Sequence, residues 1–447
     1  MLRVGTMTAF MTELNGYLWG FPMIAFLLFT HLFFTYKTKF VQKKLLRGIK
    51  LSLKGDSTQS NISPFQTLCT TLASTLGTGN IIGVATAVGL GGAGAVFWCF
   101  ITGILGMATM YCESFLSLKY RVKSADGRYK GGPMYYMTKG MRSRKTGIFY
   151  GLCASLGGLI TGSALQGNAI TTALYGFLKV PKSHSAFDIN IITLVTALLV
   201  IILTAFVIMG GVKSVGNVCQ IIVPFMAIVY ILASIGVLIV NGEYVVDAVV
   251  LIIKSAFSPQ AAVGGFVGSS VMSACRFGIS RGLFSNEAGA GTTAVVSAAA
   301  EGKNFGKLSL GAMTAAFWDT AVMCSVTGII IVSAMLANPQ AAADSAPEML
   351  ASFAFDTLPI FGRPVLFFGL VTFAFSTIIG WSYIGENCFS FVFGEKRVRT
   401  YRLLWIAMAG VSVMLNSELM WSFADTVNIL LVLPNTVSLY KLRNEIE

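Results

Sequence analysis

The most informative stretch of this chain is FQTLCTTLASTLGTGNIIGVATAV, residues 65–88. It is apolar and long enough to cross a bilayer, which takes about 20 helical residues. Its middle, STLGTGN at 74–80, nevertheless combines two glycines with small hydroxylated side chains. Non-helical backbone at membrane depth is tolerated only where it lines a protein cavity. The stretch therefore predicts a membrane helix that is broken beside a binding cavity.

The composition excludes a soluble globular protein. Of the 447 residues, 55% are hydrophobic and 11% are charged, and the mean hydropathy is +0.74. Soluble domains carry about 25% charged residues. We therefore predict an all-α polytopic membrane protein. The eight cysteines all fall in apolar segments without a CxxC pair, which indicates buried small residues and neither a metal site nor disulfides.

Apolar segments predict about eleven transmembrane helices, the first of which is an extra N-terminal helix. The stretch 241–260 is too apolar for a loop and too charged for a span, so we interpret it as a helix on the outer surface. The predicted spans are 17–35, 65–88, 94–118, 148–178, 189–209, 218–240, 261–283, 308–337, 361–391, 403–416 and 419–440.

The basic residues alternate between successive connections. Residues 36–64 carry seven Lys and Arg and residues 119–147 carry nine, whereas 338–360 carries three acids and no base. By the positive-inside rule, the N-terminus is outside and the C-terminus cytoplasmic in a cell (inner or plasma) membrane. This distribution also accounts for most of the formal charge of +13, so we do not expect a nucleic-acid partner.

A second glycine-rich interruption, GGFVGSS at 264–270, falls in a span that runs the opposite way, five helices later. Broken spans at corresponding positions of two oppositely oriented halves are typical of transporters with inverted repeats. We accordingly divide the chain into an N-terminal helix with a basic cytoplasmic segment (1–60) and two repeats (61–240 and 241–447). Tight helix packing is the alternative explanation of the glycines.

A broken helix exposes free N–H groups at one new end and free carbonyls at the other. The N–H end, with Thr78, Gly79 and Asn80, suits a carboxylate, and the carbonyl end, near Ala73 and Leu76, suits a small cation or an ammonium group. A zwitterionic amino acid carries both charges. Neither interruption contains Asp or Glu, so neutral oxygens and Na⁺ fit better than a polyvalent metal.

The chain resembles the alanine or glycine:cation symporter family, and this resemblance implies a leucine-transporter-like fold with five-plus-five inverted repeats. Departures from the family pattern are AGAGTT at 288–293, WDT and GTGNII, which leave the substrate preference open. The motifs that carry the resemblance are GTGNIIGVATAVGLGGAGAVFW (77–98), GMATMYCESFLSLKYR (106–121), GGPMYYM (131–137), RGLFSNEAGAGT (281–292), WDT (318–320), STIIGWSYIGE (376–386) and ADTVNILLVLPN (424–435).

The resemblance also implies site residues. Backbone carbonyls of the first broken helix and a hydroxyl pair would hold sodium, although such hydroxyls also bond to the backbone one turn earlier. Polar side chains would face the substrate, with Asn168 as a weaker candidate, and interhelical hydrogen bonding is their alternative role. The sodium set is Ala73, Leu76, Phe373, Ser376 and Thr377, and the substrate set is Thr78, Gly79, Asn80, Gln166, Phe266, Ser270 and Trp381.

Four acids, Glu113, Asp319, Glu386 and Asp425, lie in or near spans. An intramembrane acid indicates a functional site, and a proton relay is one interpretation. We favour structural or gate ion pairs, in which bases such as Lys119, Arg276 and Arg281 would pair with Glu113 and Glu386 toward the cytoplasmic ends of their helices. The sequence NEAG at 286–289 is interpreted as a cytoplasmic cap and gate element.

The predicted function is import of a small neutral amino acid, alanine or glycine, in symport with sodium and without an organic cofactor. Proton coupling and amino acid exchange are the alternatives within the same fold. A membrane enzyme is less favoured because the chain lacks His-rich metal sites, a GxSxG motif and a nucleotide loop. A channel lacks support because no filter sequence is repeated. The sequence does not set an oligomeric state.

Overall fold

The computed structural model describes residues 10–11, 13–53, 62–124, 127–178, 180, 189–258, 270–415 and 417–446. The described chain is helical apart from one antiparallel hairpin, β1 (Val122–Lys123) and β2 (Tyr129–Lys130), in which Val122 faces Lys130. The helices are α2 (Phe21–Lys37), η1 (Val41–Lys44), α3 (Leu45–Ser52), α4 (Pro64–Thr75), η2 (Thr78–Asn80), α5 (Ile82–Gly91), α6 (Gly94–Tyr120), α7 (Pro133–Lys139), α8 (Arg144–Gly157), η3 (Gly158–Ala164), α9 (Leu165–Leu178), α10 (Ile191–Ile208), α11 (Gly211–Val240), α12 (Gly242–Phe257), α13 (Val271–Asn286), α14 (Thr292–Ser297), α15 (Phe305–Ala312), α16 (Thr314–Ala316), η4 (Phe317–Cys324), α17 (Ser325–Ala337), α18 (Pro339–Ala343), η5 (Pro347–Met349), α19 (Leu350–Phe355), α20 (Gly362–Phe393), η6 (Glu395–Arg397), α21 (Val398–Ser412), α22 (Ser417–Lys441) and η7 (Arg443–Glu445).

Seven continuous helices in the described residues are long and apolar enough to cross a membrane. A bent pair, Pro64–Thr75 with Thr78–Gly91, adds an eighth if it is counted as one span. Helix α2, with 17 residues, and α21, with 15, are shorter than this measure requires, and the predicted span 261–283 begins outside the described residues. The multi-span helical architecture is confirmed, while the count of eleven stays a prediction.

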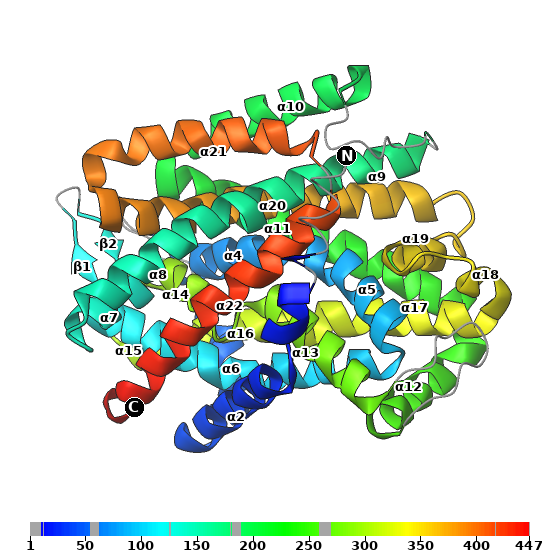
Figure 1. Ribbon diagram of the computed structural model, residues 1–447, viewed down its shortest axis with the longest axis horizontal. Helices are drawn as coiled ribbons and strands as arrows, with labels where there is room; N and C mark the ends of the chain where they lie inside the picture. Colours follow the sequence, from blue (N-terminus) through cyan, green and yellow to red (C-terminus); the bar gives the residue numbers. More distant parts are fainter. Residues whose placement is uncertain are drawn as a thin grey trace.

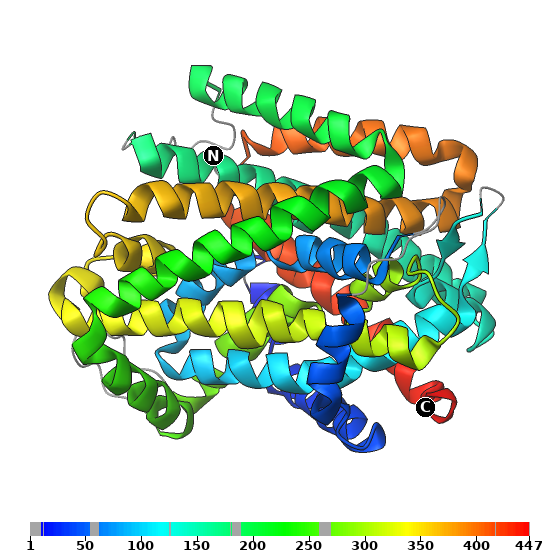
Figure 2. The same cartoon turned by 180° about the vertical axis from the view of Figure 1, so that it is seen from behind.

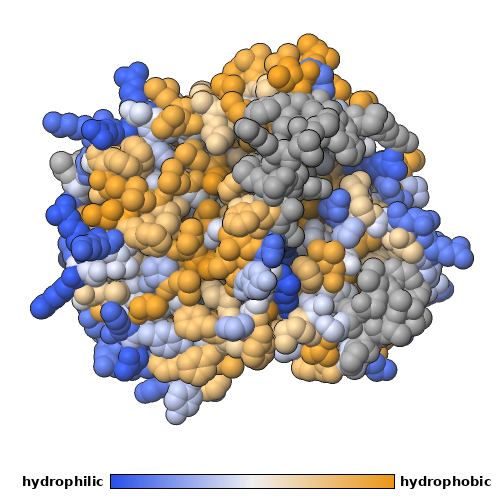
Figure 3. Space-filling model, viewed as in Figure 1, coloured by the Kyte–Doolittle hydropathy of each residue, from blue (hydrophilic) through white to orange (hydrophobic). Residues whose placement is uncertain are grey.

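Polar and apolar residues separate along the molecule. Apolar residues form a broad band across the middle of the visible face, and hydrophilic residues gather at its two ends (Figure 3). One end carries β1, β2 and α7, and the other carries α18 and α19 (Figure 1). We name them the hairpin end and the α19 end. This division matches a protein that presents its sides to lipid and its two ends to water.

The first predicted break is present. Helix α4 begins with a capping box in which Ser63 and Gln66 bond to each other's backbone, and it ends at Thr75. Gly77 is extended, with φ −128° and ψ −158°, and the short η2 leads into α5 at an angle of 63° to α4. The glycines and hydroxyls at 74–80 thus interrupt a membrane helix, as the sequence predicted.

A second interruption in the described residues lies at 287–291, after helix α13. Helix α13 is continuous to Asn286, and the chain then turns through 287–291 before α14 begins. Glu287, Gly289 and Gly291 all have positive φ angles of 57°, 101° and 77°, which glycine adopts without strain. The predicted break at 264–270 falls outside the described residues except for Ser270. The described break is therefore the stretch that the sequence analysis assigned to a cytoplasmic cap and gate.

The two broken helices lie against each other in the middle of the bundle. Helix α5 packs on α13 and α4 packs on α14, with α6 alongside α13 and α20 crossing α4 (Figure 1). Helices α11 and α17 cover the opposite face (Figure 2). A Cβ on Gly380 would lie 2.6 Å from the backbone nitrogen of Ser74, so only glycine lets α20 approach α4 this closely.

Two wide π-helical turns interrupt long helices near the breaks. Segment η3 joins α8 to α9, and η4 joins α16 to α17. Such turns are rare and concentrate at functional sites. Here η3 immediately precedes Gln166, and η4 contains Asp319.

Candidate functional site

The first break presents backbone carbonyls to two hydroxyl groups of α20. The Thr377 hydroxyl donates to the carbonyls of Leu76, at 3.2 Å, and Phe373, at 3.0 Å. The Ser376 hydroxyl donates to the same carbonyls, at 3.5 Å and 2.9 Å. All four residues are at most 3% exposed. The four predicted oxygens therefore converge on one buried position.

This oxygen set fits a sodium ion. Two carbonyls and two hydroxyls are hard, neutral ligands, and each hydroxyl oxygen has lone pairs that can turn toward a cation. The bonds to Phe373 are also the self-capping bonds that formed the alternative explanation. The bonds to Leu76 reach across to another helix, which self-capping does not explain. Ala73, the fifth predicted ligand, lies where α20 packs against α4, beside Gly380.

Gln166 joins the break to α9. Its Oε1 accepts from the backbone N–H of Thr78, at 3.3 Å, and from the Thr78 hydroxyl, at 3.1 Å. A Cβ on Gly77 would lie 2.7 Å from Thr377 Oγ1 and 3.3 Å from Gln166 Oε1. The sodium candidates and the substrate candidates therefore meet at the backbone of Gly77, where any side chain would intrude.

Asn80 is held in a buried network and its side chain is not free. Its Nδ2 donates to Asp319 Oδ1, at 2.9 Å, and to Ser285 Oγ, at 2.9 Å, while its Oδ1 accepts from the Gly77 N–H at 3.0 Å. Asp319 Oδ2 accepts from the hydroxyls of Ser285 and Thr320, each at 2.6 Å. Asp319 thus ties the first break to the end of α13.

Gly79 and Trp381 pack against different parts of the second broken helix. A Cβ on Gly79 would lie 3.0 Å from the ring of Phe284. The Trp381 Nε1 donates to Glu287 Oε1 at 2.8 Å, and a Cβ on Gly162 of η3 would collide with Trp381. Trp381, a member of the predicted substrate set, therefore lies between η3 and the second break, with its Nε1 already bonded to Glu287.

Ser270 and Asn168 bond to partners other than the two described breaks. Ser270 is exposed and caps the N-terminus of α13 by accepting from the Ser273 N–H at 3.0 Å. Helix α13 has 16 residues and is therefore about 24 Å long, at 1.5 Å per residue, which separates Ser270 from the break at 287–291. Phe266 lies outside the described residues. Asn168 Nδ2 donates to the Leu415 carbonyl.

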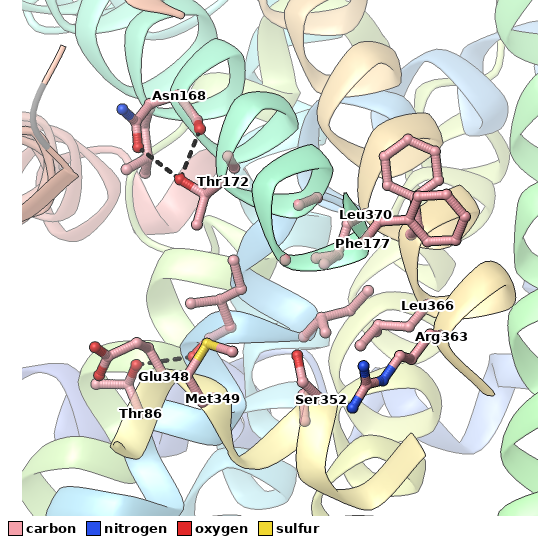
Figure 4. A pocket seen from close by; sticks show the side chains of 18 of the residues that line it. Thr86, Asn168, Thr172, Phe177, Glu348, Met349, Ser352, Arg363, Leu366 and Leu370 are labelled. Atoms are coloured by element: carbon pink, nitrogen blue, oxygen red, sulfur yellow. Dashed lines mark hydrogen bonds between the residues drawn. The ribbon is translucent and has the colours of Figure 1, made fainter. Parts of the chain in front are cut away.

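A cavity of about 480 Å³ leads toward the first break from the α19 end. In Figure 4, Asn168, Thr172 and Phe177 of α9 face Glu348, Met349 and Ser352 of η5 and α19 across it. Its lining also includes Ile81 and Leu165, which neighbour Asn80 and Gln166 in the chain. The cavity therefore reaches the surroundings of the predicted substrate residues.

An ion pair borders this cavity. Arg281 donates to both carboxylate oxygens of Asp425, at 2.9 Å and 3.2 Å, and lies 5.0 Å from the ring of Trp421. Both Arg281 and Trp421 line the cavity. The pair joins α13 to α22, and its acid is Asp425, whereas the sequence had suggested Glu113 or Glu386 as the partner of Arg281.

The other three acids differ from one another. Glu386 pairs with Arg402, at 2.7 Å and 2.8 Å, and not with the bases that the sequence suggested. Glu113 and Asp319 form no salt bridge with any described residue.

The sequence analysis missed Ser285 and Glu287 as partners of the breaks. The motif SNEAG contained both residues, but its polarity suggested a loop beyond the membrane.

Comparisons with known proteins agree with this geometry. The family model described as "Sodium:alanine symporter family" matches residues 4–447. The chain is 38% identical to the sodium/alanine symporter AgcS of Methanococcus maripaludis, over 95% of this chain and 92% of that protein. It is 33% identical to the putative sodium/proton-dependent alanine carrier protein YrbD of Bacillus subtilis, over 94% and 87%.

The fold has a solved counterpart. The crystal structure of MhsT in complex with L-phenylalanine matches with a TM-score of 0.57 and 17% identity, over 80% of this chain and 81% of that chain. This likeness confirms the leucine-transporter-like fold. The family match makes the protein an amino acid:cation symporter and not an enzyme. The whole-length match to the family model and the identities to these relatives show that the chain belongs to the sodium:alanine symporter family.

Proposed function

We propose that this protein imports a small neutral amino acid, alanine or glycine, in symport with Na⁺. The observation that carries the proposal is the convergence of Leu76, Phe373, Ser376 and Thr377 on one buried position made only of neutral oxygens. A monovalent hard cation is the ion that such a set favours. The relative AgcS, described as a sodium/alanine symporter, supports the same ion and substrate.

The substrate is proposed to lie between the first break and Gln166. Backbone N–H groups at 78–80 would bind the carboxylate, because they lie at the N-terminal end of the outer half-helix. Those of Thr78 and Asn80 would exchange their present acceptors, Gln166 Oε1 and the Gly77 carbonyl, for the substrate. Gln166 Oε1 already accepts from Thr78, so its amide would orient this end. The close approach of Thr377 and Gln166 at Gly77 leaves little room beyond the α-carbon, which favours alanine and glycine.

Proton coupling is the second candidate. It is favoured by the relative YrbD, described as sodium/proton-dependent, and by Asp319, a buried acid that touches both broken helices. An ion gradient of either kind would drive the same cycle, so the experiment must vary both.

Uptake of labelled alanine into proteoliposomes tests the proposal. We expect accumulation that requires an inward sodium gradient, that persists when the pH is equal on both sides, and that is inhibited by glycine more than by leucine. Accumulation driven by a proton gradient without sodium would contradict the sodium assignment. One-for-one exchange without any ion gradient would instead support the exchanger.

The orientation is proposed from the loop charges alone, with the N-terminus outside and the C-terminus cytoplasmic. The α19 end, which carries the cavity, then faces outward. A cysteine introduced by Ser345→Cys, in the acidic connection, should react with an impermeant reagent in intact cells. A cysteine introduced by Ser143→Cys, at the hairpin end, should react only after permeabilisation, and the reverse result would invert the topology.

A further inference from the structure

Glu113 is a buried acid that is bonded to the second break. Its Oε1 accepts from the backbone N–H of Gly289, at 2.8 Å, and from Asn435 Nδ2, at 2.7 Å. The same Asn435 amide donates to the Gly289 carbonyl at 2.8 Å. Glu113 is fully buried, and its Oε2 has no hydrogen-bond partner. The break is therefore fastened at Gly289 to one oxygen of a carboxyl group whose other oxygen is orphaned.

No base compensates this carboxyl group. Among the described residues, neither Glu113 nor Glu287 forms a salt bridge. The titratable groups around Glu113 are the acid Glu287, the neighbouring Cys112, and the phenols Tyr136 of α7 and Tyr150 of α8, while the base Lys37 of α2 lies within electrostatic range of Cys112. On the side of α2, His31 bonds to Thr109, one turn before Glu113, at 2.7 Å.

At this site the ionised form of Glu113 has a higher free energy than the protonated form. An ionised carboxylate without a cation in a low-dielectric site costs several kcal/mol, and a nearby like charge adds to this cost. A neutral acid keeps Oε1 as the acceptor of both N–H donors and places its proton on Oε2. Such an acid leaves one weak donor unsatisfied instead of a full charge.

We propose that Glu113 is a proton-binding site whose occupancy is linked to the conformation of the second break. In the state described here the proton is bonded to Oε2. When the segment 287–291 rearranges, Glu113 loses or changes its bonds to Gly289 and Asn435, and water that enters can take the proton as hydronium, leaving the carboxylate. By reciprocity, protonation of Glu113 then stabilises the arrangement in which Gly289 and Asn435 bond to Glu113, by the same free energy.

Infrared spectroscopy of the purified protein tests the protonation directly and does not depend on any transport activity. We expect the carbonyl stretch of a protonated carboxylic acid at neutral pH, and we expect its loss in Glu113→Gln. The matched control Glu395→Gln removes a carboxyl group at the hairpin end, which pairs with Lys130 at 3.2 Å, and should leave the band in place. An identical band in wild type and Glu113→Gln would overturn the proposal.

Transport measurements test the linkage, and these rest on the proposed function. With a fixed sodium gradient, the rate of alanine uptake by wild type should depend on pH. In Glu113→Gln, which keeps both acceptor bonds of Oε1, the ratio of the uptake rates at two pH values two units apart should be at least threefold smaller than in wild type. An unchanged pH profile in Glu113→Gln would contradict the linkage. If wild type does not transport alanine, the proposed substrate fails, whereas the infrared result still decides whether Glu113 is protonated.

Discussion

The two interruptions at 76–81 and 287–291 differ in the groups that bond to them. At 76–81 the freed backbone groups meet the neutral oxygens of Gln166, Ser376 and Thr377. At 287–291 the backbone and side chains meet two carboxyl groups, Glu113 through Gly289 and Glu287 through Trp381. We infer from this comparison that the two breaks have different roles. The neutral groups of the first break suit reversible binding of the ion and the substrate. The second break is bonded to carboxyl groups, and under our proposal the protonation of Glu113 changes the strength of that bonding.

The largest expected effect comes from closing the first break. Gly77→Val should reduce uptake of every substrate to background, because the new Cβ would lie 2.7 Å from Thr377 Oγ1 and next to Gln166. Gly242→Ala, where no atom lies within 4 Å of the added Cβ, is the matched control and should keep wild-type uptake. Uptake by Gly77→Val at more than a tenth of the wild-type rate would remove the first break from the substrate path.

The next effect concerns the acid that connects the two breaks. Asp319→Ala should lower the free energy of unfolding by about 3 kcal/mol or more, because it removes the buried carboxylate that accepts from Asn80, Ser285 and Thr320, and each such hydrogen bond to a charged group contributes about 1.5–3 kcal/mol. Thermal melting of the purified protein measures this change. Asp247→Ala, an exposed acid of α12, should leave the melting temperature unaltered. Equal melting of both variants would show that the breaks are not coupled through Asp319.

A smaller effect is expected at the sodium candidates. Thr377→Val keeps the shape of the side chain and removes one oxygen, a loss of about 1–1.5 kcal/mol. The sodium concentration for half-maximal uptake should therefore rise about tenfold. Thr372→Val removes a similar hydroxyl on the same helix, one that bonds only to the preceding turn, and should leave the sodium dependence as it is. The same sodium requirement in Thr377→Val and wild type would assign these hydroxyls to self-capping.

The smallest effect should come from the indole bond at the second break. Trp381→Phe loses the bond to Glu287 and keeps a ring against Gly162, so we expect uptake to fall a few-fold and its pH dependence to change. Trp98→Phe loses a comparable bond, from Nε1 to the Ala256 carbonyl of α12 at 3.1 Å, which involves no residue of either break. If both variants have the same pH profile, the Glu287 contact does not influence the second break.

The sequence predicted the first break and did not predict the interruption at 287–291, while the break predicted at 264–270 stays a prediction because it lies outside the described residues except for Ser270. Two glycines and small hydroxyls within one apolar span indicate an interrupted membrane helix. Ser376 and Thr377 could be identified as candidate ligands because they are adjacent hydroxyls in an otherwise apolar span. The stretch at 285–291 contains Asn and Glu, which resemble a loop beyond the membrane. Its burial depends on Glu113 and Asn435, which are 322 residues apart in the chain. A pattern of neighbouring residues cannot predict a hydrogen bond between two residues so far apart in the sequence.

The same limit applies to Asn80. Its residue type and position suggested a donor to the substrate, and its partner Asp319 is 239 residues away on another helix. Sequence reasoning identified Asp319 as a buried acid but could not supply its partners. The residue types of the site were therefore predictable, while the pairing of side chains required the fold.

The wide turn η3 fixes which side chains of α9 face the first break. Each residue of an α-helix rotates the chain by about 100°, so the extra residue that a π-turn accommodates changes the rotational phase of everything after it. Without that residue, Gln166 would point about a quarter-turn away from Thr78, although the helix would remain intact and buried. The orientation of the binding site is thus set by one residue in the helix that precedes Gln166. A single-residue deletion there would rotate the amide away without removing any group that contacts the first break.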